Sequence, residues 1–179
     1  MKQTKVSTLV LAALFLAVGM ILPFLTGQIK EIGNTLLPMH LPVMMCGLVC
    51  GWKYGAAVGF ILPFLRSVCF GMPPLYPNAV TMAAELCAYG LLIGIFYQIF
   101  KKKTILTVYA SLILSMIGGR LIWGIAKVLV LGLSGKGFTL AAFWAGGFVD
   151  ALPGIILQLI LIPSLMALIN TLTKKKKRN

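Results

Sequence analysis

The stretch from Ala151 to Thr173 reads ALPGIILQLILIPSLMALINTLT and contains no charged side chain. A helix needs about 20 predominantly apolar residues to cross the hydrocarbon core of a bilayer, and this stretch is long enough. Five basic residues, Lys174 to Arg178, follow it directly. Because basic clusters favour the anionic inner face of a membrane, we predict a membrane-spanning helix whose C-terminal end is cytoplasmic.

The composition of the whole chain indicates the same environment. Of 179 residues, 60% are hydrophobic and 11% are charged, and the mean hydropathy is +1.00, whereas roughly a quarter of the residues in soluble domains are charged. The formal net charge is +13, but the basic residues cluster between and after apolar runs, which argues against a nucleic-acid-binding surface. We predict a single all-α integral membrane domain over residues 1–179, surrounded by membrane lipid, with no soluble catalytic domain and no nucleic-acid partner.

Apolar runs and the breaks between them predict six transmembrane helices in one bundle. A turn at Trp52-Lys53, prolines 73 and 74 and a triple lysine separate successive runs. Six spans place both termini on one side of the membrane, and the distribution of Lys and Arg makes that side cytoplasmic. We expect the outer loops 26–35 and 132–149 to serve as lids, the second of them partly embedded. The expected spans are residues 6–25, 36–51, 54–70, 76–100, 104–131 and 151–173.

The embedded polar side chains concentrate in the halves of the spans that are predicted to face outward. Charge inside a bilayer is costly, so ionisable groups within the spans are candidates for function. A channel or proton path needs polar groups at several depths. The asymmetry therefore favours a pocket that is open outward and sealed below. The candidate substrate-binding residues are His40, Arg66, Asn78, Glu85, Arg120, Trp123, Lys127, Asp150 and Gln158.

A structural role stays open for each of these residues taken alone. Glu85 can pair with Arg120 only to hold the bundle together, and Asp150 can pair with Lys127 in the same way. Tryptophans such as Trp123 are also common anchors at a membrane interface. The convergence of the whole set at one depth nevertheless favours a binding cavity.

No enzyme motif occurs in the chain. The segment GLSGKG at residues 132–137 resembles a phosphate-binding loop, but Val130 takes the place of its first glycine and Gly137 that of its Ser/Thr. One histidine and three carboxylates offer no plausible zinc ligand set, and the cysteines lack a Cys-x-x-Cys spacing. We therefore expect no enzymatic activity, no metal and no other cofactor.

Pairs of small residues four apart let membrane helices approach each other closely. We assign most such pairs in this chain, including Gly47 with Gly51, to packing within the bundle. Ala13 and Ala17 differ because they lie in the first span without polar neighbours. We expect them to form a flat face that docks a helix of another protein.

Several short features occur together along the chain: the six-span plan, the Ala13-x-x-x-Ala17 pair, the segment MHLPVMMCGLVCGWKYG at residues 39–55, the GMPP loop at 71–74 and Pro153-Gly154. In this combination the chain resembles the substrate-binding S components of energy-coupling-factor (ECF) vitamin transporters. The resemblance implies that the outer loops close over a vitamin-sized ligand and that the first span docks onto a membrane coupling subunit. It also implies two separate ATPase subunits, which use the ATP, and a multi-pass location in a prokaryotic cell membrane.

The charges near the expected cavity favour an anionic ligand. Three basic candidate residues stand against two acidic ones, and an arginine can bind a carboxylate or phosphate bidentately. Pantothenate and a folate-like acid both satisfy this condition. The alternative function is a self-sufficient secondary carrier for a small organic solute. Such carriers show repeated halves and polar groups at the midplane, and no clear repeat is present here.

Overall fold

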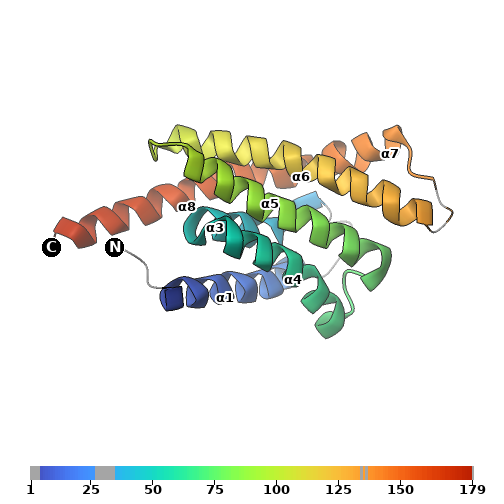
Figure 1. Cartoon of the computed structure of the whole chain (residues 1–179), viewed down its shortest axis with the longest axis horizontal. Coiled ribbons are helices and arrows are strands. Elements are labelled where there is room, and N and C mark those ends of the chain that lie inside the picture. Colours follow the sequence, from blue (N-terminus) through green and yellow to red (C-terminus); the bar gives the residue numbers. More distant parts are fainter. Residues whose placement is uncertain (1–4, 27–34, 134, 136, 179) are drawn as a thin grey trace.

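The computed structural model describes residues 5–26, 35–133, 135 and 137–178, and this part of the chain is helical without any strand. The long helices follow the long axis of the molecule and form one bundle (Figure 1). The predicted all-helical architecture is therefore confirmed. In chain order the elements are α1 (Lys5–Ile21), η1 (Leu22–Thr26), α3 (His40–Cys50), α4 (Trp52–Phe70), η2 (Leu75–Ala79), α5 (Val80–Ile99), α6 (Ile105–Leu133), α7 (Leu140–Trp144), η3 (Ala145–Val149) and α8 (Leu152–Arg178).

Five helical stretches are long and apolar enough to cross a membrane, and together they indicate a multi-pass membrane protein. A further apolar helix, α3, has only 11 residues. At a rise of 1.5 Å per residue it covers about half of the roughly 30 Å hydrocarbon core. The count of six crossings and the side on which the termini lie stay predictions. The five stretches are Lys5–Phe24, Trp52–Phe70, Leu75–Ile99, Ile105–Leu133 and Leu140–Thr173.

The two ends of the bundle differ. Helix α1 begins and α8 finishes at one end (Figure 1). Helices α1, α4 and α6 run toward the opposite end, called the distal end here, and α3, α5 and α8 run away from it. Residues 27–34 of the first expected lid lie outside the described residues. Residues 134 and 136 of the second expected lid also lie outside them. In the second lid, residues 140–149 form the short helices α7 and η3 instead of a loop.

Two glycines with positive φ set the ends of α3 and α4. Gly51 has a φ of 94° and joins the two helices in a backbone conformation that favours glycine. Gly71 has a φ of 69°, and its N–H donates to the carbonyl of Ser67 at 3.0 Å, which caps the end of α4. The turn predicted at Trp52-Lys53 is wrong, because Gly51 turns the chain and Trp52 already begins α4.

Helix α5 packs against α3, α4 and α6 and forms the centre of the bundle. It meets α4 by direct approach of the two backbones. A Cβ atom added to Gly90 would lie 2.2 Å from the carbonyl oxygen of Gly55, and one added to Gly59 would lie 2.2 Å from that of Leu86. No side chain fits at such distances, so these glycines serve internal packing, as the sequence predicted.

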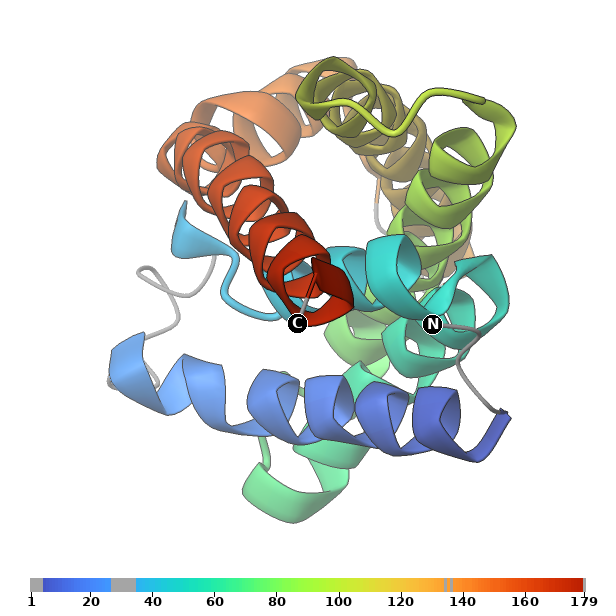
Figure 2. The same ribbon diagram turned by 90° about the vertical axis from the view of Figure 1, so that its left-hand side faces the viewer.

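Helix α1 lies at the edge of the bundle and packs against α3 and α4 (Figure 2). Gly19 faces inward, where an added Cβ atom would lie 2.6 Å from the side chain of Leu62. The opposite side of α1 is an apolar face that the described part of the chain leaves uncovered. Its exposed residues are Val6, Leu9, Val10, Ala13, Leu14, Ala17, Val18 and Ile21.

Candidate ligand-binding site

Three buried polar side chains meet where α3, α5 and α6 pack together. Oε1 of Glu85 on α5 accepts a hydrogen bond from Nη1 of Arg120 on α6 at 2.7 Å. His40, the first residue of α3, places Nε2 3.3 Å from the same oxygen. The exposed fraction is 2% for Glu85, 3% for Arg120 and 1% for His40. Candidate residues of the fourth and fifth predicted spans therefore face each other, and His40 joins them.

Tyr89 supports this buried charge cluster from one turn farther along α5. Its ring packs edge-on against the imidazole of His40, with centroids 5.1 Å apart. The other contact is with Gly119 of α6, where an added Cβ atom would lie 2.8 Å from the tyrosine ring. Tyr89 is not among the candidate binding residues that the sequence predicts. Its contacts make it a positioning residue for His40.

The buried charge cluster is not fully hydrogen-bonded. Nδ1 and Nε2 of His40 and Nε and Nη2 of Arg120 have no hydrogen-bond partner in the described part of the chain. Nε2 lies near Glu85 but outside hydrogen-bond geometry. Each buried polar group without a partner costs about 1–3 kcal/mol, so open nitrogens at this density are typical of a site that binds something else. No three His, Cys, Asp or Glu side chains within the described ranges could hold a metal ion together.

A second, half-buried set of polar residues continues the cluster toward the distal end. Nζ of Lys127 donates to Oδ1 of Asn78 at 3.2 Å. Trp123 lies between the two sets, because its ring centroid is 5.9 Å from Cζ of Arg120 and 5.8 Å from Nζ of Lys127. Both are cation–π distances. We name as the polar site the predicted residues that these contacts connect: His40, Asn78, Glu85, Arg120, Trp123 and Lys127.

The short helices α7 and η3 cover the polar site on the side of α6. The ring of Phe143 packs against Gly124, where an added Cβ atom would lie 2.5 Å from it. Gly146 packs against the indole of Trp123, where an added Cβ atom would lie 3.3 Å from the ring. This covering surface, the aromatic cap, takes the place of the second predicted lid, and its movement stays a prediction. Its rings belong to Phe138, Phe143, Trp144 and Phe148.

Arg66 lies outside the polar site, although it is 2% exposed. Its Nη1 donates to the backbone carbonyl of Met20. Its guanidinium also lies 5.3 Å from the ring centroid of Phe24 and 5.2 Å from that of Phe70. These contacts tie the distal end of α1 to the distal end of α4.

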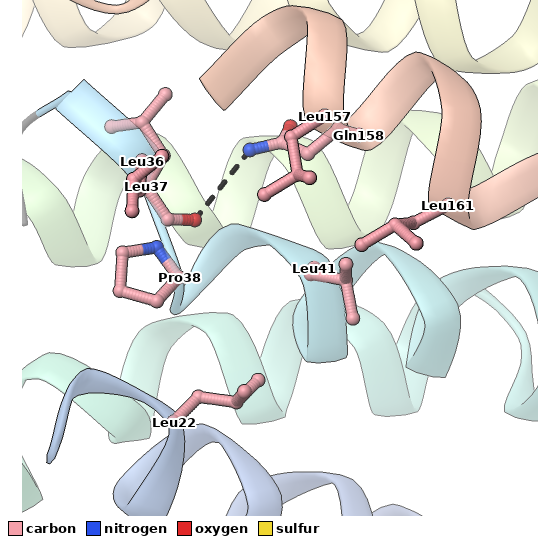
Figure 3. A pocket seen from close by; sticks show the side chains of 8 residues that line it. All are labelled: Leu22, Leu36, Leu37, Pro38, Leu41, Leu157, Gln158 and Leu161. Carbon is pink, nitrogen blue, oxygen red and sulfur yellow. Dashed lines mark hydrogen bonds between the residues drawn. The ribbon is translucent and has the colours of Figure 1, made fainter. Parts of the chain in front are cut away.

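The two candidate residues near the start of the last span lie in different surroundings. Asp150 is exposed, and no ion pair joins it to Lys127 in the part of the chain that the structure describes. Gln158 is 2% exposed, and its Nε2 donates to the carbonyl of Leu37 at 3.5 Å. It lines a cavity of about 140 Å³ that no polar-site residue lines (Figure 3). The other lining residues are Leu22, Leu36, Leu37, Pro38, Leu41, Leu157 and Leu161.

No sequence pattern pointed to this cavity, because leucines in an apolar chain carry no distinguishing signal. Leu37 is its most unusual residue. Its φ of 50° lies in the left-handed region, which costs a non-glycine residue roughly 1–2 kcal/mol. The hydrogen bond from Gln158 helps to hold the segment in that conformation.

An apolar helical bundle whose buried charges gather in its distal half has the features of a membrane-embedded solute-binding protein. The chain matches the family described as ECF transporter, substrate-specific component, over residues 7–166. It therefore belongs to this family, whose members are binding subunits of transporters and not enzymes, and which act with a coupling module that contains ATPases. No curated protein and no solved structure matches the chain.

Proposed function

We propose that this chain is the S subunit of an ECF-type importer and captures a vitamin or related small molecule in a pocket that faces outside the cell. The observation that carries the proposal is the polar site itself. Polar side chains from three helices converge there, and two of these helices contribute charged groups to a predominantly apolar bundle. Under this proposal the distal end faces outward and both termini are cytoplasmic.

The ligand in this proposal is a small anion. Within the polar site, Arg120 and Lys127 stand against Glu85, which leaves one positive charge in surplus. Arg66 contacts Met20, Phe24 and Phe70 instead, and Asp150 is exposed. A monoanion such as pantothenate would bring the charge count of these residues to zero, and a folate-like acid, which has two carboxylates, would also supply an anionic group to Arg120.

Helix α1 provides the docking surface for the membrane coupling subunit. Ala13 and Ala17 are exposed on its uncovered face, and their small side chains would let a partner helix approach closely. Two ATPase subunits bound to the coupling subunit would use the ATP. This chain needs no cofactor of its own under that arrangement.

Replacing Ala13 and Ala17 by Trp tests the docking surface. We expect ATP-dependent uptake into vesicles that contain the coupling subunit and both ATPases to fall to background, because the bulky rings separate the helices. Ligand affinity of the purified chain should stay within about twofold, since α1 contributes no polar-site residue. Ala167→Trp is the matched control, because Ala167 is an exposed alanine on α8. Equal loss of affinity and uptake in the α1 variants would contradict the docking role.

The same vesicles distinguish the alternative function. With an imposed ion gradient and no partner subunits, an S subunit should bind its ligand without accumulating it. Gradient-driven accumulation by the chain alone would identify a self-sufficient secondary carrier instead.

A further inference from the structure

The guanidinium of Arg120 is occupied on one side and open on the other. Nη1 donates to Glu85, whereas Nε and Nη2 have no partner in the described part of the chain. The N–H groups of Nε and Nη2 point to the same side of the planar group. They form a parallel fork that matches the two oxygens of a carboxylate. The side chain is only 3% exposed, so this fork is held inside the bundle and away from solvent.

We propose that the open fork of Arg120 binds a carboxylate group of the ligand, and that the substrate class is therefore the organic monocarboxylates. The inference rests on the proposed function and narrows its ligand. Glu85 holds the guanidinium in place through Nη1 and leaves the fork edge for the ligand. His40, which contacts the same Glu85 oxygen, offers Nδ1 as a further buried nitrogen without a partner.

Charge distinguishes a carboxylate from other groups that accept hydrogen bonds. Among the polar-site residues, Arg120 and Lys127 carry positive charge and Glu85 carries negative charge, and Glu85 is paired with Arg120. A carboxylate brings one negative charge and balances the site. A phosphate ester carries about −1.5 to −2 and would place excess negative charge beside the buried Glu85. A neutral amide or alcohol would bring no negative charge to the open fork of Arg120.

Entry of the ligand requires the cover over the site to move, since the fork nitrogens are buried in this conformation. The aromatic cap is the described cover on the α6 side, where Phe143 contacts Gly124 and Gly146 contacts Trp123, about one helical turn from Arg120. The structure therefore corresponds to the closed form of the site.

Matched pairs of acids and neutral analogues test the proposal on the purified full-length chain in detergent. The probes are nicotinate with nicotinamide, pantothenate with panthenol, and biotin with biotinamide, and pyridoxal phosphate serves as the phosphate probe. We expect at least one acid to bind, measured by calorimetry, and its neutral analogue to bind about 100-fold more weakly or less, because the fork is then unpaired. Absence of acid binding, equal binding within every pair, or preference for the phosphate probe would overturn the proposal.

Two substitutions act on the fork in opposite directions. Arg120→Lys keeps the charge but removes the parallel donors, and we expect it to weaken acid binding at least about tenfold. Glu85→Gln keeps an acceptor for Nη1 and removes the competing negative charge, so acid binding should become tighter while that of the neutral analogue stays unchanged. Lys53→Arg, an exposed change at the start of α4, is the control. If Arg120→Lys does not fold, the sign of the Glu85→Gln effect decides alone, and weaker acid binding contradicts the proposal.

Failure of this inference differs from failure of the proposed function. A neutral molecule that binds tightly and is imported only with the coupling partners would overturn the carboxylate class and leave the S-subunit function intact. If none of the probes and no copurified molecule is imported with the partners, the proposed function itself fails.

Discussion

Two buried arginines at the distal half of the bundle have different surroundings. Arg66 contacts the backbone carbonyl of Met20 in α1 and the aromatic rings of Phe24 in η1 and Phe70 in α4. Arg120 finds the carboxylate of Glu85 and keeps two nitrogens open. The first arrangement is that of a structural tie between helices, and the second is that of a site that accepts a ligand.

Replacing Arg66 by Ala should therefore lower stability and leave ligand affinity unchanged. The substitution removes a charged hydrogen bond and two cation–π contacts, so we expect a loss of about 2–4 kcal/mol, measured by thermal unfolding in detergent. Lys53→Ala is the control, because Lys53 is exposed and lies 5.4 Å from a single ring, that of Trp52. An unchanged melting temperature together with lost affinity would place Arg66 in the binding site, as the sequence alone indicated.

Helical periodicity predicts which residues share a face, and this sufficed for much of the polar site. Residues 78 and 85 share one face of η2 and α5, residues 120, 123 and 127 share one face of α6, and the structure joins the two faces. Periodicity says nothing about which helices are neighbours. Periodicity therefore could not predict that Arg66 contacts α1 and lies outside the polar site. Nor could it predict that Asp150 is exposed.

At the scale of the elements, backbone contact between α4 and α5 fixes the centre of the bundle. Gly55 and Gly90 lie opposite each other at the point of closest approach. Since α5 also carries Glu85 and Tyr89, this contact sets the depth at which the buried charge cluster meets α6.

Gly90→Ala should disrupt that contact. The added methyl group would lie 2.2 Å from the backbone carbonyl oxygen of Gly55, which cannot rotate away as a side chain can. We expect a loss of about 1–3 kcal/mol in stability, measured as a lower melting temperature. Gly132→Ala is the matched control near the end of α6, because an added Cβ atom there meets nothing within 4 Å. Equal melting temperatures for the two variants would contradict this account of helix packing.

Most helices could be predicted from the apolar runs, whereas several boundaries could not. Helices α4 and α8 run through Pro63 and Pro163, as the predicted spans do, whereas the α8 helix extends past the expected span end at Thr173 to Arg178. The segment expected as a partly embedded loop contains α7 and η3. Tertiary packing decides such details, since the aromatic side chains of α7 and η3 pack against α6 and against each other.

Over the whole molecule, charged groups of different kinds gather at opposite ends. The buried charge cluster lies in the distal half, whereas Lys53 and the lysines after α5 lie exposed toward the other end. Because cytoplasmic loops are rich in Lys and Arg, this distribution supports the proposal that the distal end faces outward. The apolar face of α1 is then positioned within the membrane, where a coupling subunit could contact it.

Ligand occupancy of three purified proteins compares the two arginines directly. The small molecule that copurifies with the full-length chain is identified by mass spectrometry, radiolabelled and measured by equilibrium dialysis against the wild type, Arg120→Lys and Arg66→Lys. We predict equimolar binding to the wild type and to Arg66→Lys, and binding at least about tenfold weaker to Arg120→Lys. Full occupancy of Arg120→Lys with loss of binding to Arg66→Lys would contradict the assignment of the polar site.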